Sequence, residues 1–206
     1  MRAARGPNGE RIVLTHDVCG RVVRRRIERD SFRAKVWTYE WDPFDRLAAC
    51  TAPDGARWSY SYDPFHRRVE KREHLQPVMG AVFRKPRRAG TRFSWDGDVV
   101  AEEIPLLEDG SLDLAERVTW HFEPGGFAPV ARESAGAKGE SETGFVVTDH
   151  LGTPKDILDS HGNERWSASH RLWGGLREAK AARPKHAVNG ATALAAPEDD
   201  TTGADL

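Results

Sequence analysis

The sequence has few of the features that anchor an enzyme, a metal site or a membrane segment. Its 206 residues include two cysteines, Cys19 and Cys50, and neither has partners at metal-binding spacing, so we interpret both as structural thiols. No apolar run approaches the ~20 residues that span a bilayer, and the first residues contain no apolar signal core. These absences predict cytoplasmic synthesis, with no signal peptide and no membrane-spanning segment.

Recognisable catalytic and metal-binding patterns are missing as well. The eight histidines show neither a helical i, i+4 pair nor a cysteine partner, so we expect no metal and no cofactor. Asp149 and His150 are adjacent and could exchange protons, but Thr148, Thr153 and Ser160 do not lie in a context that activates a nucleophile. We therefore expect no catalytic residue and assign Asp149 and His150 to a turn.

What the sequence does have is repetition. Residues 16–22, 41–47 and 62–68 align as aromatic-Asp-x-x-x-Arg-apolar, with His16 in the first aromatic place and Arg68 in the last apolar place, and their aspartates are 25 and 21 residues apart. Aromatic residues at every second position precede two of these aspartates, which is the period of a β-strand. These residues are Trp37, Tyr39 and Trp41, then Trp58, Tyr60 and Tyr62. The pattern predicts successive hairpins.

The repeated aspartate and arginine have a simple structural use. A carboxylate at the end of a strand can accept backbone N–H groups of the following turn, and an arginine four residues later can donate a charge-assisted bond back to it. We expect this of Asp42 with Arg46 and of Asp63 with Arg67. Gly20 suits a positive-φ position in the first copy, and the corresponding Asp45 and His66 belong to residue types enriched in that conformation.

Weaker copies of the pattern extend the array. Residues 93–97 and 120–125 each pair alternating aromatics with an acidic turn, and Pro53-Asp54-Gly55 can fold one strand onto the next. Residues 144–176 then read as strand, turn and strand. Their structural residues are Asp149, His150, Gly152 and Pro154 in the loop, followed by Trp166, Trp173 and Gly174.

These patterns suggest four parts. Residues 1–132 form the hairpins, with a loop insertion near 74–92; residues 133–143 form a flexible loop; residues 144–176 form the last motif; and residues 177–206 form a disordered tail. Between the two loops we expect strands at 99–100 and 104–107 and a helical turn within 112–117.

Charge is distributed unevenly along the chain. Residues 1–93 hold 21 Lys and Arg against 11 Asp and Glu, and residues 94–206 hold 10 against 21. The basic cluster at 84–88 lies near aromatic residues and is the best candidate for binding nucleic acid. Because those aromatics alternate as strand residues do, we favour a solvated loop and expect no nucleic-acid partner.

Taken together, these residues resemble the Rhs (rearrangement hotspot) family of YD-repeat proteins, related in architecture to the shells of teneurins and insecticidal toxin-complex proteins. The resemblance rests on Trp41 to Arg46, Tyr62 to Arg67, Trp95-Asp96-Gly97-Asp98, Phe122-Glu123-Pro124-Gly125, and above all Asp149-His150-Leu151-Gly152-Thr153-Pro154 followed by Trp173-Gly174.

The resemblance implies a β-strand spiral, of which this chain is a partial segment, wrapping a hollow shell that encloses a C-terminal toxin for delivery between competing bacteria. It also implies that the parent proteins are exported or act at the cell surface. The family's Asp-Pro-x-Gly self-cleavage motif and toxin domain are not found here, so we expect a non-catalytic shell fragment that ends before them. Its expected partners are other Rhs shell segments or a secretion-system component.

Two other readings stay open at this stage. Trp and Tyr on an open β surface can stack on sugar rings, which would make the chain a carbohydrate or cell-surface binding module. A remnant of a self-cleaving Rhs peptidase is less favoured, because Asp42-Pro43 and Asp63-Pro64 are not followed by the motif's glycine.

Overall fold

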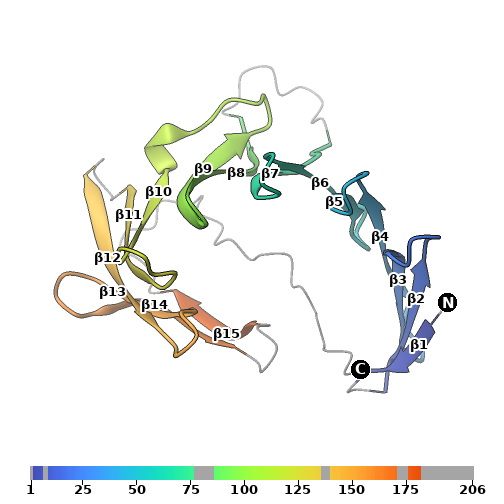
Figure 1. The fold of residues 1–206 in the computed structure, drawn as a ribbon. Helices are drawn as coiled ribbons and strands as arrows, with labels where there is room; N and C mark the ends of the chain where they lie inside the picture. The colour runs from blue at the N-terminus through green and yellow to red at the C-terminus, as the bar shows by residue number, and fades with distance from the viewer. Residues whose placement is uncertain (1, 7–8, 77–85, 136–139, 171–175, 182–206) are drawn as a thin grey trace. The chain divides into compact units, whose positions relative to one another are not determined.

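The computed structural model describes residues 2–6, 9–76, 86–135, 140–170 and 176–181. The predicted all-β hairpin array is confirmed: the described residues form β-strands and one 3-10 turn. The chain divides into two compact units, residues 1–117 and residues 118–206. Figure 1 shows that the strands of each unit follow one another in the order of the sequence.

In unit 1 each strand pairs antiparallel with the strand before it and the strand after it. The strands are β1 (Arg2–Arg5), β2 (Arg11–His16), β3 (Val22–Glu28), β4 (Lys35–Trp41), β5 (Leu47–Thr51), β6 (Arg57–Tyr62), β7 (Arg68–Glu73), β8 (Arg88–Asp96) and β9 (Val99–Leu107), followed by the 3-10 turn η1 (Leu114–Glu116). The strands expected at 99–100 and 104–107 are one strand, β9, and the expected helical turn is η1.

Unit 2 repeats the same antiparallel arrangement with six strands. They are β10 (Val118–Phe122), β11 (Pro129–Ala135), β12 (Ser141–Thr148), β13 (Pro154–Leu158), β14 (Glu164–His170) and β15 (Leu176–Ala181). Among the described residues no helix is long and apolar enough to cross a bilayer.

Three expected irregular segments are shorter than the sequence suggested. Strand β8 begins at Arg88, inside the insertion expected near 74–92. Strand β11 continues to Ala135 and β12 begins at Ser141, so both ends of the loop expected at 133–143 are strand residues. Strand β15 covers 177–181 of the expected tail. In each case pairing with a neighbouring strand orders residues whose local composition is typical of loops. The rest of the tail lies outside the described residues.

Each unit is a single layer of sheet, and this sets the character of its interior. The main contacts between elements join neighbours in the sequence, each strand with the next strand and β9 with η1. Among the described residues no large side chain is less than 2% exposed. The buried apolar residues are Ile12, Val13, Ile27, Ala49, Ala89, Ile104 and Leu106 in unit 1, with Ile157 and Ala168 in unit 2. Stable domains usually bury one layer against another, so these sheets depend heavily on their hydrogen bonds and cross-strand pairs.

Candidate functional site: the turn ladder

One type of five-residue turn recurs between strands. The N–H of its first residue donates to the carbonyl of the fifth, and the N–H of the fourth donates to the carbonyl of the first. The fourth residue has positive φ in every copy. Such turns begin at Gly6, Asp17, Asp42, Ala52, Asp63, Leu107, Asp149 and Asp159.

The predicted positive-φ residues are confirmed. Gly20 has φ 84°, and Asp45 and His66 have φ 60° and 65° in the same place of their turns. A side chain in the left-handed region costs roughly 1–2 kcal/mol, and Asp and His tolerate it better than branched residues do. The sequence therefore places residues suited to this conformation at the position that demands it.

The aspartate at the start of a turn holds the turn closed. Its Oδ1 accepts the N–H groups of the third and fifth residues, at 2.8–2.9 Å in all five aspartate turns. In three turns Oδ2 accepts the Nε–H of the arginine at the fifth position, at 2.7 Å. The predicted hydrogen bonds of Asp42 with Arg46 and of Asp63 with Arg67 are thus present.

These hydrogen bonds favour the ionised carboxylates. Partial burial by itself would raise the pKa of Asp42 and Asp63, but the backbone and guanidinium N–H donors of Arg46 and Arg67 outweigh it and lower the pKa of both aspartates. The pKa of Asp149 is lowered mainly by the N–H groups of Thr153 and Leu151. The turns therefore carry fixed negative charges, each satisfied within its own turn.

Each of these three arginines also reaches forward to a later turn. Arg21 Nη1 donates to the carbonyl oxygen of Asp42 at 3.2 Å and to Asp45 Oδ1 at 2.7 Å. Arg46 Nη1 donates to the carbonyl oxygen of Asp63 at 3.3 Å, and Arg67 Nη1 donates to that of Gly97. We call this chain of linked turns, from Asp17 to Gly97, the turn ladder.

The aromatic residues before Asp42, Asp63 and Asp96 make a second set of links between the turns of the ladder. Trp41 Nε1 donates to the carbonyl of Val22 at 2.8 Å, Tyr62 Oη to that of Leu47 at 3.0 Å, and Trp95 Nε1 to that of Arg68 at 3.0 Å. Each acceptor directly follows the arginine of the preceding turn. A large ring with a polar group at one end is needed at this position, which explains why Trp and Tyr recur there.

Stacking completes the contact between consecutive turns. The guanidinium of Arg46 lies 5.1 Å from the ring centroid of Phe44 and 4.9 Å from that of Tyr62. Arg67 repeats this with Phe65 at 5.0 Å and Trp95 at 5.7 Å. A planar cation between two rings needs arginine rather than lysine.

The motif at residues 144–176 contains the same kind of turn, at Asp149, but with different side-chain partners. Thr153 replaces the arginine at the fifth position of the Asp149 turn, and Gly152 supplies the positive φ of 83°. Pro154 opens β13, and the His150 side chain is exposed. Trp166 lies half-buried in β14 opposite Ile157. Trp173 and Gly174 lie outside the described residues.

The sequence predicted a strand, a turn and a strand within residues 144–176, but it did not identify the residue that closes the turn between β13 and β14. Asp159 accepts the N–H groups of His161 and Asn163, together with side-chain bonds from Asn163 and Arg165. The backbone and side-chain donors of Asn163 contribute most to lowering its pKa, to about 2. The spacing Asp-x-x-Gly, shared with the Asp149 turn, was the signal that could have identified it.

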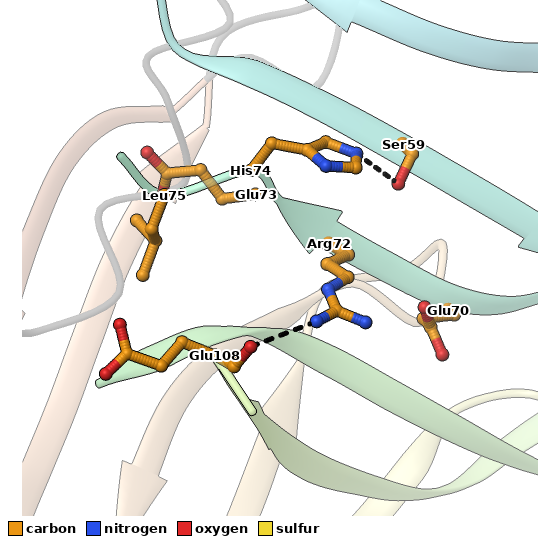
Figure 2. A pocket seen from close by; sticks show the side chains of 7 residues that line it. All are labelled: Ser59, Glu70, Arg72, Glu73, His74, Leu75 and Glu108. Carbon is orange, nitrogen blue, oxygen red and sulfur yellow. Dashed lines mark hydrogen bonds between the residues drawn. The ribbon is translucent and has the colours of Figure 1, made fainter. Parts of the chain in front are cut away.

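A shallow hollow of ≈ 360 Å³ lies on unit 1, lined by Ser59, Glu70, Arg72, Glu73, His74, Leu75 and Glu108 (Figure 2). His74 Nε2 lies 3.0 Å from Ser59 Oγ, and Arg72 Nη2 donates to the carbonyl oxygen of Glu108 at 3.1 Å. The Glu70 carboxylate is bonded to Arg92. In a Ser–His–acid triad the acid orients the histidine, and among the described residues no carboxylate is hydrogen-bonded to the exposed imidazole of His74.

In the part of the chain that the structure describes, no group of three His, Cys, Asp or Glu side chains could hold a metal ion, and neither Cys19 nor Cys50 forms a disulfide. The turn ladder is therefore the most developed constellation of polar side chains, and its geometry is that of a structural connection.

Comparison with known proteins matches the same segments. The family model described as RHS Repeat matches residues 41–73, and the model described as RHS protein matches residues 145–180. The first range holds the Asp42 and Asp63 turns, and the second holds the Asp149 and Asp159 turns.

Two proteins with matching segments are similar to this chain in sequence. The chain is 33% identical over 170 residues to the probable deoxyribonuclease RhsB of Dickeya dadantii, covering 82% of this chain and 11% of the relative. It is 30% identical over 124 residues to the toxin protein Tse5 of Pseudomonas aeruginosa, covering 47% of this chain and 9% of that protein. The chain thus spans about a tenth of the length of these relatives.

Solved structures with similar strand arrangements include the complex TcdB2-TccC3-Cdc42, with a TM-score of 0.47, 10% identity, and coverage of 86% of this chain and 11% of that one. The Tc holotoxin pore of Photorhabdus luminescens matches with a TM-score of 0.42 and 11% identity, covering 89% and 12%.

Proposed function

Since this chain belongs to the Rhs family of YD-repeat proteins, we propose that it is a non-catalytic wall segment of a shell that encloses a toxin polypeptide. In this role the sheet separates an enclosed chain from its surroundings, and the delivery of that toxin serves competition between bacteria. The partners it needs are further Rhs wall segments, joined along strand edges, and a component of the secretion machinery that exports the shell.

The turn ladder is the observation that carries this proposal. A wall must stay continuous although it is one layer thick, and it cannot rely on a deep core. In unit 1 consecutive hairpins are linked by strand pairing and also at their ends, through the arginine and the aromatic residue of each repeat. These links repeat from turn to turn, so they support a sheet that extends hairpin by hairpin.

The carbohydrate-binding alternative is weakened by the surroundings of the aromatic rings. Stacking on a sugar needs an open ring face, but Arg25 lies 5.1 Å from the Trp37 centroid and Lys71 lies 4.6 Å from that of Trp58. Binding to a glycan array that is lost on replacing Trp37 or Trp58 with serine would favour that alternative.

A segment exchange tests the wall proposal directly. The matching 170-residue region of Dickeya dadantii RhsB is replaced by this chain, and protease protection of everything downstream is compared with unmodified RhsB. We expect protection to be retained, and to be lost when Arg46 and Arg67 are both replaced by alanine in the exchanged segment. Loss of protection in the unmutated exchange, while the chain alone gives a β-type far-ultraviolet circular dichroism spectrum, contradicts the proposal.

A further inference from the structure

One side of the sheet in unit 1 carries aromatic rings and cations together. Trp37 on β4 lies opposite Arg25 on β3, and Tyr60 on β6 lies opposite Lys71 on β7. Cross-strand partners point to the same side of a sheet, as do residues two apart on a strand. We call this side the aromatic face; it comprises Arg25, Trp37, Tyr39, Cys50, Trp58, Tyr60 and Lys71.

The rings of the aromatic face are only half-buried. Trp37, Tyr39, Trp58 and Tyr60 all retain solvent exposure, although aromatic side chains of this size usually supply the core of a domain. Cations lie over three of the rings, with Arg68 5.3 Å from the centroid of Tyr60 in addition to the Arg25 and Lys71 contacts. The aromatic face thus offers a wide, partly apolar surface with positive charge spread across it.

The two sides of the sheet differ in charge. On the opposite side, cations pair with carboxylates: Arg57 with Glu40 at 2.6 Å and Arg92 with Glu70 at 3.1 Å. Over β3 to β7 the aromatic face carries four cations, Arg25, Lys35, Arg68 and Lys71, and one carboxylate, that of Glu73 on β7. The aromatic face therefore has the larger excess of positive charge, since over the same strands the opposite side combines Arg24, Arg26, Arg57 and Arg72 with Glu28, Glu40 and Glu70.

We propose that the aromatic face holds an acidic, extended polypeptide segment, and that it is the side of the wall turned toward the enclosed chain. This rests on the proposed wall function and names the chemistry of its cargo. Carboxylates of such a segment would pair with Arg25, Lys35, Arg68 and Lys71, while its apolar side chains would pack on the exposed parts of the rings. Nucleic acid fits less well, because base stacking needs the ring faces that the cations cover.

Binding to poly-L-glutamate tests this inference on the full 206-residue chain. Fluorescence anisotropy of the labelled polymer, measured at low salt, should show saturable binding. Replacing Arg25 and Lys71 together with glutamine should weaken it by about tenfold, since an exposed ion pair changes affinity by up to about fivefold. The matched control replaces Arg24 and Arg72 with glutamine. These residues are next to Arg25 and Lys71 in the sequence but lie on the opposite face, so the control removes the same net charge. The control should change binding by less than about twofold.

Several results would overturn the inference. Equal weakening by the two double variants would show that net charge alone attracts the polymer. If single-stranded DNA binds as tightly as the polymer, with the same dependence on Arg25 and Lys71, the ligand of the aromatic face is a nucleic acid and not a polypeptide. Absence of binding by a chain whose circular dichroism shows β structure would refute the aromatic face as a docking surface. A successful segment exchange in RhsB would leave the wall proposal standing in each of these cases.

Discussion

Arg46 gives the sharpest test of the turn ladder, because lysine would keep its charge and remove its shape. Its guanidinium bonds to Asp42 within the turn and to the carbonyl oxygen of Asp63 in the next, while lying between the rings of Phe44 and Tyr62. A lysine ammonium can stay near the Asp42 carboxylate, but it cannot make both directed bonds and stack as a plane.

The expected loss from Arg46→Lys follows from these contacts. The hydrogen bond to the next turn contributes about 0.5–1.5 kcal/mol. Cation–π contacts at exposed sites contribute about 0.5–1 kcal/mol, and lysine retains part of that. We therefore expect the free energy of unfolding to fall by about 1–2 kcal/mol. With a urea dependence of about 2 kcal/mol per molar, the midpoint should fall by roughly 0.5–1 M.

Urea unfolding followed by far-ultraviolet circular dichroism and by tryptophan fluorescence measures this change. The control is Arg57→Lys, since Arg57 also bonds a carboxylate, that of Glu40, but both side chains are about half exposed. The control midpoint should move by less than about 0.3 M, as is usual for a surface ion pair. If Arg46→Lys unfolds at the wild-type midpoint, or if Arg57→Lys costs as much, the planar contacts of Arg46 do not hold the turns together.

Three further outcomes follow from the structure. Gly90→Ala should destabilise unit 1 by about 1–3 kcal/mol, measured by urea unfolding, because the added Cβ would lie 2.0 Å from the backbone oxygen of Lys71. The pKa of Asp159 is lowered to about 2, so its stabilising contribution is present above its ordinary value of 3.8 and is lost as the pH falls from there toward 2; acid titration of the wild type against Asp159→Asn should reveal it. Thiol labelling should modify exposed Cys19 faster than half-buried Cys50.

For each of these three predictions, a specific result would contradict the reasoning. Gly126→Ala is the control for Gly90→Ala, because its Cβ would be 3.3 Å from the nearest atom; equal effects would exclude the clash. An Asp159→Asn chain with the same acid response as wild type would show that the turn does not depend on that carboxylate. Equal labelling rates at Cys19 and Cys50 would mean that the β5 strand opens as readily as the first turn.

The local chemistry of the turns could be read from the sequence because it involves residues four apart. The Asp-x-x-x-Arg spacing predicted the hydrogen bonds of Asp42 with Arg46, and residue type predicted the positive φ of Asp45. Alternation of aromatics predicted strands β4 and β6. These features depend on backbone geometry over one turn or strand, which a short pattern determines.

Contacts between turns could not be read in the same way. The partner of Trp41 is the carbonyl of Val22, which becomes its neighbour only through the pairing of β3 with β4. Strand β15 was taken for tail because its residues are rich in Ala and charge, and the ordering comes from pairing with β14. Long-range pairing, rather than local propensity, decided these cases.

The arginine links between the turns of the ladder all run in one direction. Arg21 reaches the turn at Asp42, Arg46 reaches the turn at Asp63, and Arg67 reaches Gly97, so each donor precedes its acceptor in the chain. As the polypeptide leaves the ribosome, every new hairpin therefore meets a neighbour that already presents both its strand edge and its arginine. The sheet can close turn by turn in the order of synthesis, without waiting for any residue still to be made.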